Sequence, residues 1–371
     1  MRTLPAAYAA AAAVLALVAV GAGCASQRAA HPASTLAAVG SSHAPAVPPS
    51  AESPGVPGAP AGGIVGRALT NPDLTVTGDG LYARLSLSPA QQDPPQVELA
   101  RVDVATGAIL ATNKFSPGWI GAPLAAAGSL WLTGSFAGHT MLLRLDPRTL
   151  MVTGELTIPP VNSGAEQSHI AFAGGSIWVD GSDELVRVAP ATVTAQLTIP
   201  LTGADSSDVD ASRDGRTLIV SESTGGDGSV QRRDPVTGTL LATHPLLGVT
   251  APMIGGVSAA GTWVSEPTGM LGYIERFAAS SMTPQAQTRV HGSNGLRADD
   301  WGGVLWVRDQ SGGPVENYCA DPATGRRLAT IPLPDLAEDY LMTVTGGLIY
   351  YSVPASSGFV IRTVPVPAAC G

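Results

Sequence analysis

The stretch DGRTLIVSESTGGDGSVQRRDPVTGTLLATHPL, residues 214–246, decides the fold. It contains three short strand-like segments (TLIVSES, GSVQRR and TLLATHPL) that are separated by a Gly-rich turn and by an Asp-Pro turn. Runs of this length between turn residues indicate β-strands joined as hairpins. The stretch GGVLWVRDQSGGPVENYCADPATGRRLATIPL, residues 302–333, follows the same plan. The chain therefore contains a repeated all-β unit.

The unit can be followed along the chain by one large apolar residue in its second strand. This position is occupied, in order, by Tyr82, Trp131, Trp178, Ile219, Trp263, Trp306 and Tyr350. Successive copies are 49, 47, 41, 44, 43 and 44 residues apart. A period in the forties, with four short strands in each period, is typical of β-propellers. We therefore expect an all-β, seven-bladed β-propeller with four-stranded antiparallel blades over residues 64–371. The repeated large residues should pack between blades.

The turn before the fourth strand has a recurring Asp-Pro sequence. Good copies are Asp146-Pro147, DPVTG at 234–238 and DPATG at 321–325, whereas the third and fifth units have APATV and AASSM instead. Asp bonds to the backbone of the turn, Pro presets φ at the next position, and Gly adopts the left-handed conformation. We expect the face that carries these turns to be structural.

The N-terminal residues 1–23 have the pattern of an export signal, with Arg2 near the start and an apolar run from Ala6 to Ala22. The run ends in GAGCAS, which resembles the signal of bacterial lipoproteins. That resemblance implies a lipid on Cys24 and attachment to the outer face of the bacterial cell membrane. Ordinary signal cleavage and an uncleaved anchor are the alternatives. Residues 24–63, rich in Ala, Pro, Ser and Gly, are predicted to be a disordered tether.

The end of the chain has to close the ring. The last unit, from about Asp339, has room for only three strands, and an open strand edge invites aggregation. We therefore expect Ile64–Leu69 to supply the missing outer strand. Cys319 and Cys370 are predicted to form a disulfide bond, because exported proteins usually pair their cysteines; two free thiols are the alternative.

Composition excludes several classes of protein. Charged residues make up only 13% of the chain, which also has 44 Gly and 31 Pro, so a coiled coil or helical bundle is excluded. A content of 44% apolar residues excludes a chain disordered by charge. With 20 basic and 29 acidic residues, the net charge is −9 and there is no basic stripe. We therefore expect no nucleic-acid partner.

The stretches at 214–246 and 302–333 resemble repeats of the bacterial YVTN-type seven-bladed propellers and of the related streptogramin-lyase-like propellers. The similarity extends over nearly all of residues 64–371 but lies in scaffold positions. It implies the fold and leaves the function open, because propellers host binding proteins and enzymes alike. The streptogramin lyases use His and Glu residues with magnesium, and their WFTE run is WVRD at 306–309 here. That departure argues against lyase chemistry.

The loops after the second and fourth strands, such as 86–96 and 201–210, are longer and less regular than the other turns. We expect them around the mouth of the central tunnel, where binding residues concentrate. Trp119 is expected in one of the loops between blades. Counting back eleven and nine residues from each repeated large residue gives positions at this mouth. The polar ones, predicted to bind a ligand, are Asn71, Asp73, Gln167, His169, Asp208, Asp210, Arg297 and Asp339.

Four carboxylates against one Arg in this set favour a cation, a metal or a basic ligand group; a solvated rim is the alternative. The leading hypothesis is a non-enzymatic, monomeric surface lipoprotein that binds an extracytoplasmic protein, a glycan or a small ligand and needs no cofactor. The alternative is a metal-dependent lyase or hydrolase of the streptogramin-lyase-like type. It would use His and carboxylate groups at the tunnel mouth, with a divalent metal such as magnesium or calcium as cofactor.

Overall fold

In the computed structural model, the described residues are 64–65 and, with gaps in the loops, 73–371. The longest gaps within the second range are residues 87–95, 159–168 and 334–341. Residues 1–63 lie outside the described residues. The predicted signal peptide, the lipidation of Cys24 and the tether therefore stay predictions.

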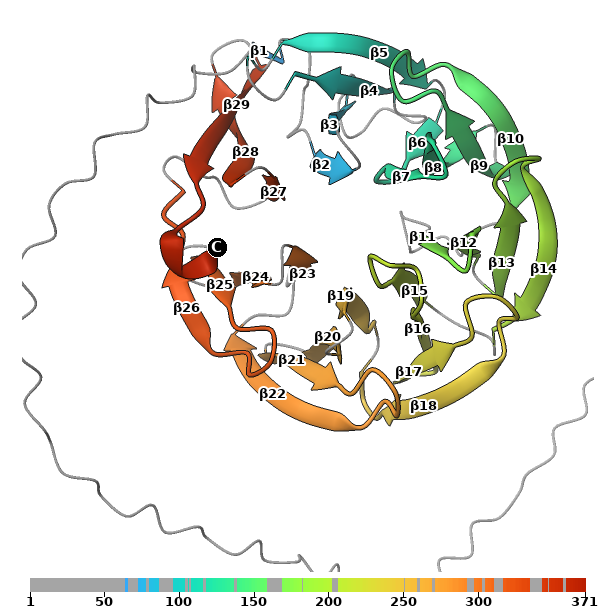
Figure 1. Cartoon of the computed structure of the whole chain (residues 1–371), viewed down its shortest axis with the longest axis vertical. Coiled ribbons are helices and arrows are strands. Elements are labelled where there is room, and N and C mark those ends of the chain that lie inside the picture. Colours follow the sequence, from blue (N-terminus) through green and yellow to red (C-terminus); the bar gives the residue numbers. More distant parts are fainter. Residues whose placement is uncertain are drawn as a thin grey trace, which may run out of the picture. The chain divides into compact units, whose positions relative to one another are not determined.

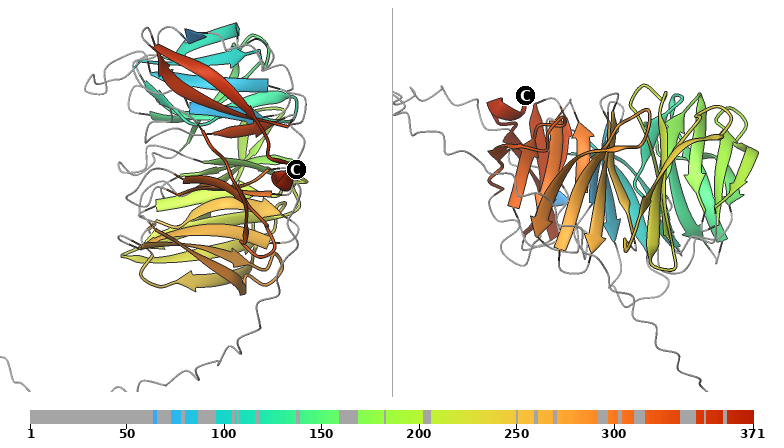
Figure 2. Two further views of the ribbon diagram at one scale, coloured as in Figure 1. Left: turned by 90° about the vertical axis from the view of Figure 1, so that its left-hand side faces the viewer. Right: turned by 90° about the horizontal axis from the view of Figure 1, so that it is seen from below.

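The strands of the described residues form seven antiparallel sheets that are arranged in a ring (Figure 1). Within a sheet the strands follow one another from the inside of the ring to the outside (Figure 1). In the edge-on view the blades stand side by side and the connections project on the two faces of the ring (Figure 2). The predicted seven-bladed β-propeller is confirmed.

We number the blades in chain order. Blade 1 consists of β2 (Asp73–Thr77), β3 (Gly80–Ser86), β4 (Val97–Val102) and β5 (Ile109–Phe115). Blade 2 consists of β6 (Gly118–Ile120), β7 (Leu124–Ala126), β8 (Ser129–Phe136), β9 (His139–Leu145) and β10 (Val152–Ile158). Blade 3 consists of β11 (Ile170–Ala173), β12 (Ser176–Asp180), β13 (Glu184–Ala189) and β14 (Thr194–Pro200). Blade 4 consists of β15 (Ser206–Ala211), β16 (Leu218–Thr224), β17 (Asp227–Arg233) and β18 (Leu240–Leu246).

The remaining blades complete the ring. Blade 5 consists of β19 (Met253–Ser258), β20 (Gly261–Thr268), β21 (Leu271–Phe277) and β22 (Pro284–His291). Blade 6 consists of β23 (Arg297–Trp301), β24 (Val304–Asp309), β25 (Glu316–Ala320) and β26 (Arg327–Thr330). Blade 7 consists of β27 (Thr343–Thr345), β28 (Leu348–Ala355), β29 (Gly358–Pro365) and β1 (Ile64–Val65), and the 3-10 helix η1 (Ala368–Cys370) follows β29.

The innermost strand of blade 2 is interrupted. Both β6 and β7 pair with β8, β6 with residues 134–136 and β7 with residues 129–131. The two short strands therefore share one innermost position, and the blade keeps the expected four-stranded plan. The expectation that Trp119 lies in a loop between blades was wrong, because β6 begins upstream of the interruption and includes this residue.

The N-terminal end of the described chain closes the ring. Ile64 lies opposite Val360 and Val65 lies opposite Phe359 in an antiparallel pairing of β1 with β29. The order in blade 7 is β27, β28, β29 and β1, so β1 is the outermost strand. The predicted closure is confirmed for these two residues, while residues 66–69 lie outside the described part of the chain.

The repeated large residues are buried, at 0 to 4% exposure, and each packs in a core shared with the next blade. Trp178 of blade 3, for example, packs with Val209 and Leu218 of blade 4. Tyr350 of blade 7 packs with Leu81 of blade 1, which completes the circle. The expectation that these residues pack between blades is confirmed.

The polar tips of several of these side chains bond to the turn before the fourth strand of the next blade. The acceptor is each time the carbonyl of the turn's proline: Tyr82 Oη donates to Pro147 O at 3.3 Å, Trp178 Nε1 to Pro235 O at 3.2 Å and Trp263 Nε1 to Pro322 O at 2.9 Å. A buried indole N–H or phenol O–H needs such a partner. The repeated aromatic residue of one blade is therefore in direct contact with the repeated Asp-Pro turn of the next blade.

An arginine on the third strand bonds to the same turn, and we call this bond the inter-blade clasp. The arginine lies directly opposite the repeated large residue in the sheet register. The clasps are Arg144 Nη1 to Pro190 O and Ala191 O, both at 3.0 Å, Arg187 Nη1 to Val236 O, Arg232 Nη1 to Ser280 O at 3.2 Å, and Arg276 Nη1 to Ala323 O at 2.8 Å. Each clasp ties the third strand of one blade to the turn of the next.

The turn that receives the clasp keeps its shape even where Asp, Pro or Gly is missing. Leu150, Val193 and Met282 have φ values of 60, 53 and 54° at the position where Gly238 and Gly325 have 72 and 70°. This conformation costs a residue with a side chain about 1–2 kcal/mol. The three side chains are buried between blades, and burying an aliphatic side chain contributes about 1.5–3 kcal/mol. Burial therefore offsets the backbone strain.

A disulfide bond replaces the clasp between blades 6 and 7. Cys319 lies opposite Trp306, at the register position of the clasp arginines. It is bonded to Cys370 in η1, and both cysteines are buried in one core with Trp306. Because η1 follows β29 of blade 7, the bond joins blades 6 and 7 at the position where an arginine joins the successive blades from 2 to 6. The predicted disulfide is confirmed.

Removal of the disulfide in the double variant Cys319→Ser with Cys370→Ser should lower the free energy of unfolding by about 2–4 kcal/mol. Cys319→Arg with Cys370→Ser places an arginine at the clasp position, but blade 7 has no turn before its fourth strand to accept the bond, so we expect it not to regain this loss. Thermal unfolding of the two full-length variants beside the wild type measures both effects. Unchanged stability in the serine variant would contradict the role given to the bond.

Candidate functional site

Five of the eight predicted tunnel-mouth residues are described only in part or lie outside the described residues. Asn71, Gln167 and Asp339 lie outside the described residues. Asp73 and Arg297 are the first residues of β2 and β23, and only their backbone is described. Both therefore stand at the start of an innermost strand, as the counting rule predicts, while their role in binding stays a prediction.

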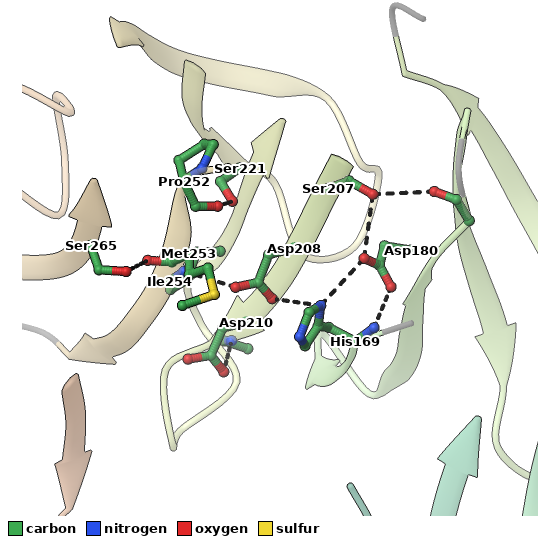
Figure 3. A network of polar contacts seen from close by, with 12 residues as sticks. His169, Asp180, Ser207, Asp208, Asp210, Ser221, Pro252, Met253, Ile254 and Ser265 are labelled. Carbon is green, nitrogen blue, oxygen red and sulfur yellow. Dashed lines mark hydrogen bonds and ion pairs between the residues drawn. The ribbon is translucent and has the colours of Figure 1, made fainter. Parts of the chain in front are cut away.

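The structure brings two of the predicted residues together. His169 immediately precedes β11, and Asp208 lies on β15 of the next blade. The Nδ1 atom of His169 is 3.2 Å from Oδ1 of Asp208 (Figure 3). Asp210 lies on the same strand as Asp208, and its Oδ1 accepts the N–H of Ala211 at 2.7 Å. His169 and Asp208 thus form one polar group across the junction of blades 3 and 4.

The sequence analysis missed a polar position two residues after each repeated large residue. Its occupants are Arg84, Thr133, Asp180, Ser221, Ser265, Arg308 and Ser352. Arg84 is half-buried and the others are no more than 5% exposed. Because side chains alternate along a strand, this position points to the same side as the large residue, toward the next blade. In the sequence, this position can be recognised as a polar residue within an otherwise apolar strand.

In blades 1 and 4 this polar position bonds to the next blade at or just before its innermost strand, and we call the bond the inner fastener. Arg84 Nη1 donates to Ile120 O at 2.7 Å, and Ser221 Oγ donates to Pro252 O at 2.7 Å. Ile120 and Pro252 both stand eleven residues before the large residue of their own blade. The same bond therefore recurs at different junctions.

Between blades 3 and 4 the inner fastener is a carboxylate, Asp180. Its Oδ1 accepts the backbone N–H of His169, and its Oδ2 accepts the hydroxyl of Ser207 at 3.3 Å. The hydroxyl of Ser207 is also 3.2 Å from Gly181 O. Ser207 is on the innermost strand of blade 4, so these contacts hold the two blades together at the site (Figure 3).

The imidazole of His169 lies beside both carboxylates. Its Nδ1 is 3.2 Å from Asp208 Oδ1 and 3.6 Å from Asp180 Oδ2, while Asp208 Oδ2 accepts the N–H of Ile254 of blade 5 at 2.8 Å. Asp180 and Asp208 are buried, whereas the side chain of His169 is 38% exposed. Its Nε2 lies on the side of the ring away from both carboxylates (Figure 3). The group therefore spans three blades and presents one ring edge outward.

Burial raises the pKa of Asp180 from 3.8 to about 6. Removal from water is the largest cause, and the charge of nearby Asp208 adds to it. The hydrogen bond and charge of His169 act in the opposite direction but do not outweigh the loss of solvent. A carboxyl group with a raised pKa beside an imidazole is typical of sites that bind or transfer protons.

Two further features concern the described residues alone. Within them, no group of three or more His, Cys, Asp or Glu side chains is placed to hold a metal ion. In the same part of the chain, no helix has the length and apolar character needed to cross a membrane. Metal binding therefore stays a prediction from the sequence.

The fold and the site define the chain as a seven-bladed β-propeller with a His–carboxylate group where blades 3 and 4 meet. No protein-family model matches the sequence. No curated protein matches it either.

Solved structures match the fold. BamB from Moraxella catarrhalis matches with a TM-score of 0.51 and 14% identity, over 78% of this chain and 95% of that chain. Quinohemoprotein alcohol dehydrogenase from Comamonas testosteroni has a TM-score of 0.47 and 10% identity, over 79% and 66% of the two chains. Hydrazine synthase from Kuenenia stuttgartiensis has 0.47 and 18%, over 61% and 70%. At this identity the match to BamB shows a shared fold, and the two lower scores add nothing to it.

The variant Asp180→Asn should change how stability depends on pH. Because folding raises the pKa of Asp180 to about 6, this carboxyl group favours folding most below pH 3.8, and the contribution is lost as the pH rises through about 6. Asn does not ionise, and its oxygen can still accept the N–H of His169. Between about pH 4 and pH 7.5, the variant should therefore gain about 3 kcal/mol relative to the wild type, measured by thermal unfolding.

Ser221→Ala is the matched control for this experiment. It removes the inner fastener of the next junction, where the side chain does not ionise. Its effect on stability should therefore be the same at both pH values. A difference between Asp180→Asn and the wild type that does not change with pH would contradict the raised pKa.

Proposed function

We propose that this protein is an exported, membrane-tethered β-propeller that acts as a non-enzymatic binding or interaction platform. Its partner is an extracytoplasmic protein, a glycan or a small ligand that is held at the tunnel mouth. On the resemblance of its repeats, the chain is of the YVTN-type or streptogramin-lyase-like kind. A lipid on Cys24 anchors the monomer to the outer face of the bacterial cell membrane.

The observation that carries this proposal is the difference between the two faces of the ring. The turns before the fourth strands are occupied by the clasps and by the proline contacts. The second and fourth strands end on the other face, because neighbouring strands are antiparallel. The sequence segments that follow β3 and β10, residues 87–95 and 159–168, are long. Irregular loops on a rigid scaffold are favoured places for binding residues.

The position of the polar group formed by His169, Asp180 and Asp208 also supports the proposal that this face is the binding face. His169 stands between the long connection 159–168 and the innermost strand β11, so it lies at the end of the blade that carries the irregular loops. A partly exposed polar side chain on a rigid support suits specific recognition. We therefore infer that this part of the tunnel mouth contacts the partner.

Two features support export. Disulfide bonds persist in oxidising compartments outside the cytoplasm, and Cys319 and Cys370 form one. Residues 1–23 have the pattern of an export signal that ends before Cys24. The enzymatic alternative, a metal-dependent lyase or hydrolase, stays a prediction that no observation on the described residues favours over a platform.

Leu247 and Met151 offer a matched test of the binding face. Leu247, 78% exposed, follows the fourth strand of blade 4, whereas Met151, 67% exposed, precedes the fourth strand of blade 2 on the opposite face. A photo-crosslinking amino acid at position 247 of the full-length protein, in the producing bacterium, should give a discrete adduct. The same amino acid at position 151 should give little or none.

Equal adducts at both positions, or none at position 247, would contradict the proposal. In the same cells, Cys24→Ala should move the protein out of the membrane fraction. A Cys24→Ala variant that stays with the membrane would contradict the lipid anchor and leave the binding face untouched.

A further inference from the structure

The junction between blades 3 and 4 differs from neighbouring junctions in the side chain of its inner fastener. Thr133, Ser221 and Ser265 occupy this position in blades 2, 4 and 5, and none of them is charged. Asp180 is instead an acid that burial keeps from ionising freely. A buried acid where the neighbouring blades have a hydroxyl side chain is a sign of function.

The group is arranged to share one proton among three side chains. His169 Nδ1 lies 3.2 Å from one carboxylate and 3.6 Å from the other. Each carboxylate also accepts a backbone N–H. Asp180 accepts that of His169, and Asp208 accepts that of Ile254. Fixed carboxylates at one ring nitrogen orient the imidazole and strengthen it as a base. The outward edge of the ring leaves a path for protons to and from solvent.

The charged groups on the strands next to the His169 ring are acidic, while the clasp arginine of the same junction, Arg187 of β13, lies opposite Trp178 and bonds to Val236 O at the outer turn. β12 contributes Asp180, β15 contributes Asp208 and Asp210, and β16 contributes Glu222, which lies opposite Ser207 in register. The neighbouring strands β7, β8, β11 and β19 contain no charged residue. All the charged neighbours on these strands are thus acidic, and acidic neighbours favour the protonated imidazole.

We propose that His169, Asp180 and Asp208 form a proton-binding site that regulates ligand binding at the tunnel mouth. On mild acidification the group takes up one proton, so the negative charge of this rim falls by one. A ligand that presents a positively charged group is then held more tightly at neutral pH than at mildly acidic pH. The regulation rests on the proposed function, because it takes this face to be the binding face.

The proton site can be tested on the free protein by NMR. Full-length protein labelled with 15N-histidine is titrated from about pH 4.5 to pH 8.5, and the ring signals of His169 are assigned with His169→Gln. Asp208→Asn and Asp180→Asn each remove a negative charge, so each should lower the His169 midpoint by roughly half a pH unit or more. The midpoints of His139 and His244 should not move.

Two further variants keep the test decisive if an Asn variant does not fold. Ser207→Ala removes only a hydroxyl that bonds to Asp180, so it keeps both carboxyl groups but disfavours the charged form of Asp180 and should lower the His169 midpoint. Ser221→Ala, the control at the next junction, should leave the midpoint unchanged. A His169 midpoint that is the same in the wild type, Asp208→Asn and Ser207→Ala would overturn the proposal.

The regulatory step has a separate readout. The adduct formed through position 247 should decrease on mild acidification in the wild type, and in Asp208→Asn it should decrease at a lower pH, in step with the lowered His169 midpoint. If an adduct forms but the variants do not shift the His169 midpoint, the platform function is supported and the proposed regulation is contradicted. Shifted midpoints without any adduct would contradict the proposed function instead, so the two failures can be told apart.

Discussion

From blade 1 to blade 5, each blade bonds to a turn of the blade that follows it, and the ring depends on this contact. A large side chain such as Trp178 or Trp263 enters the core of the next blade and bonds to the carbonyl of its turn. The arginine across the strand bonds to the same turn. One blade alone would leave these apolar faces exposed to water, so stability arises between blades. The contact also fixes the turn, which keeps a left-handed residue even where that residue is Val193.

The departures from the repeat then have physical explanations. At the end of the chain no turn is left for a clasp, and the disulfide from Cys319 to Cys370 takes its place while β1 completes the last blade. At the junction of blades 3 and 4 the inner fastener is Asp180, whose pKa is raised by burial and which accepts the backbone N–H of the partly exposed His169. The first departure keeps the ring closed, and the second gives the rim a titratable group.

The fold could be predicted because the contact between blades requires one large residue at a nearly constant interval. The same regularity located His169 and Asp208, since an innermost strand starts at a fixed distance before that residue. The sequence could not show that Asp180 and Ser207 join them, because that depends on which side chains of neighbouring blades meet. Trp119 was misplaced because the split innermost strand of blade 2 has no counterpart in the other units.

Native-state hydrogen exchange on Trp263→Ala is the most direct test of the contact between blades. Trp263 belongs to blade 5 but lies in a core with Leu305 and Tyr318 of blade 6. Removal of its ring should lower the free energy of unfolding by about 3–5 kcal/mol. We predict faster exchange at the amides of Leu305 and Tyr318 as well as within blade 5. Faster exchange in blade 5 alone, with blade 6 unchanged, would contradict the account.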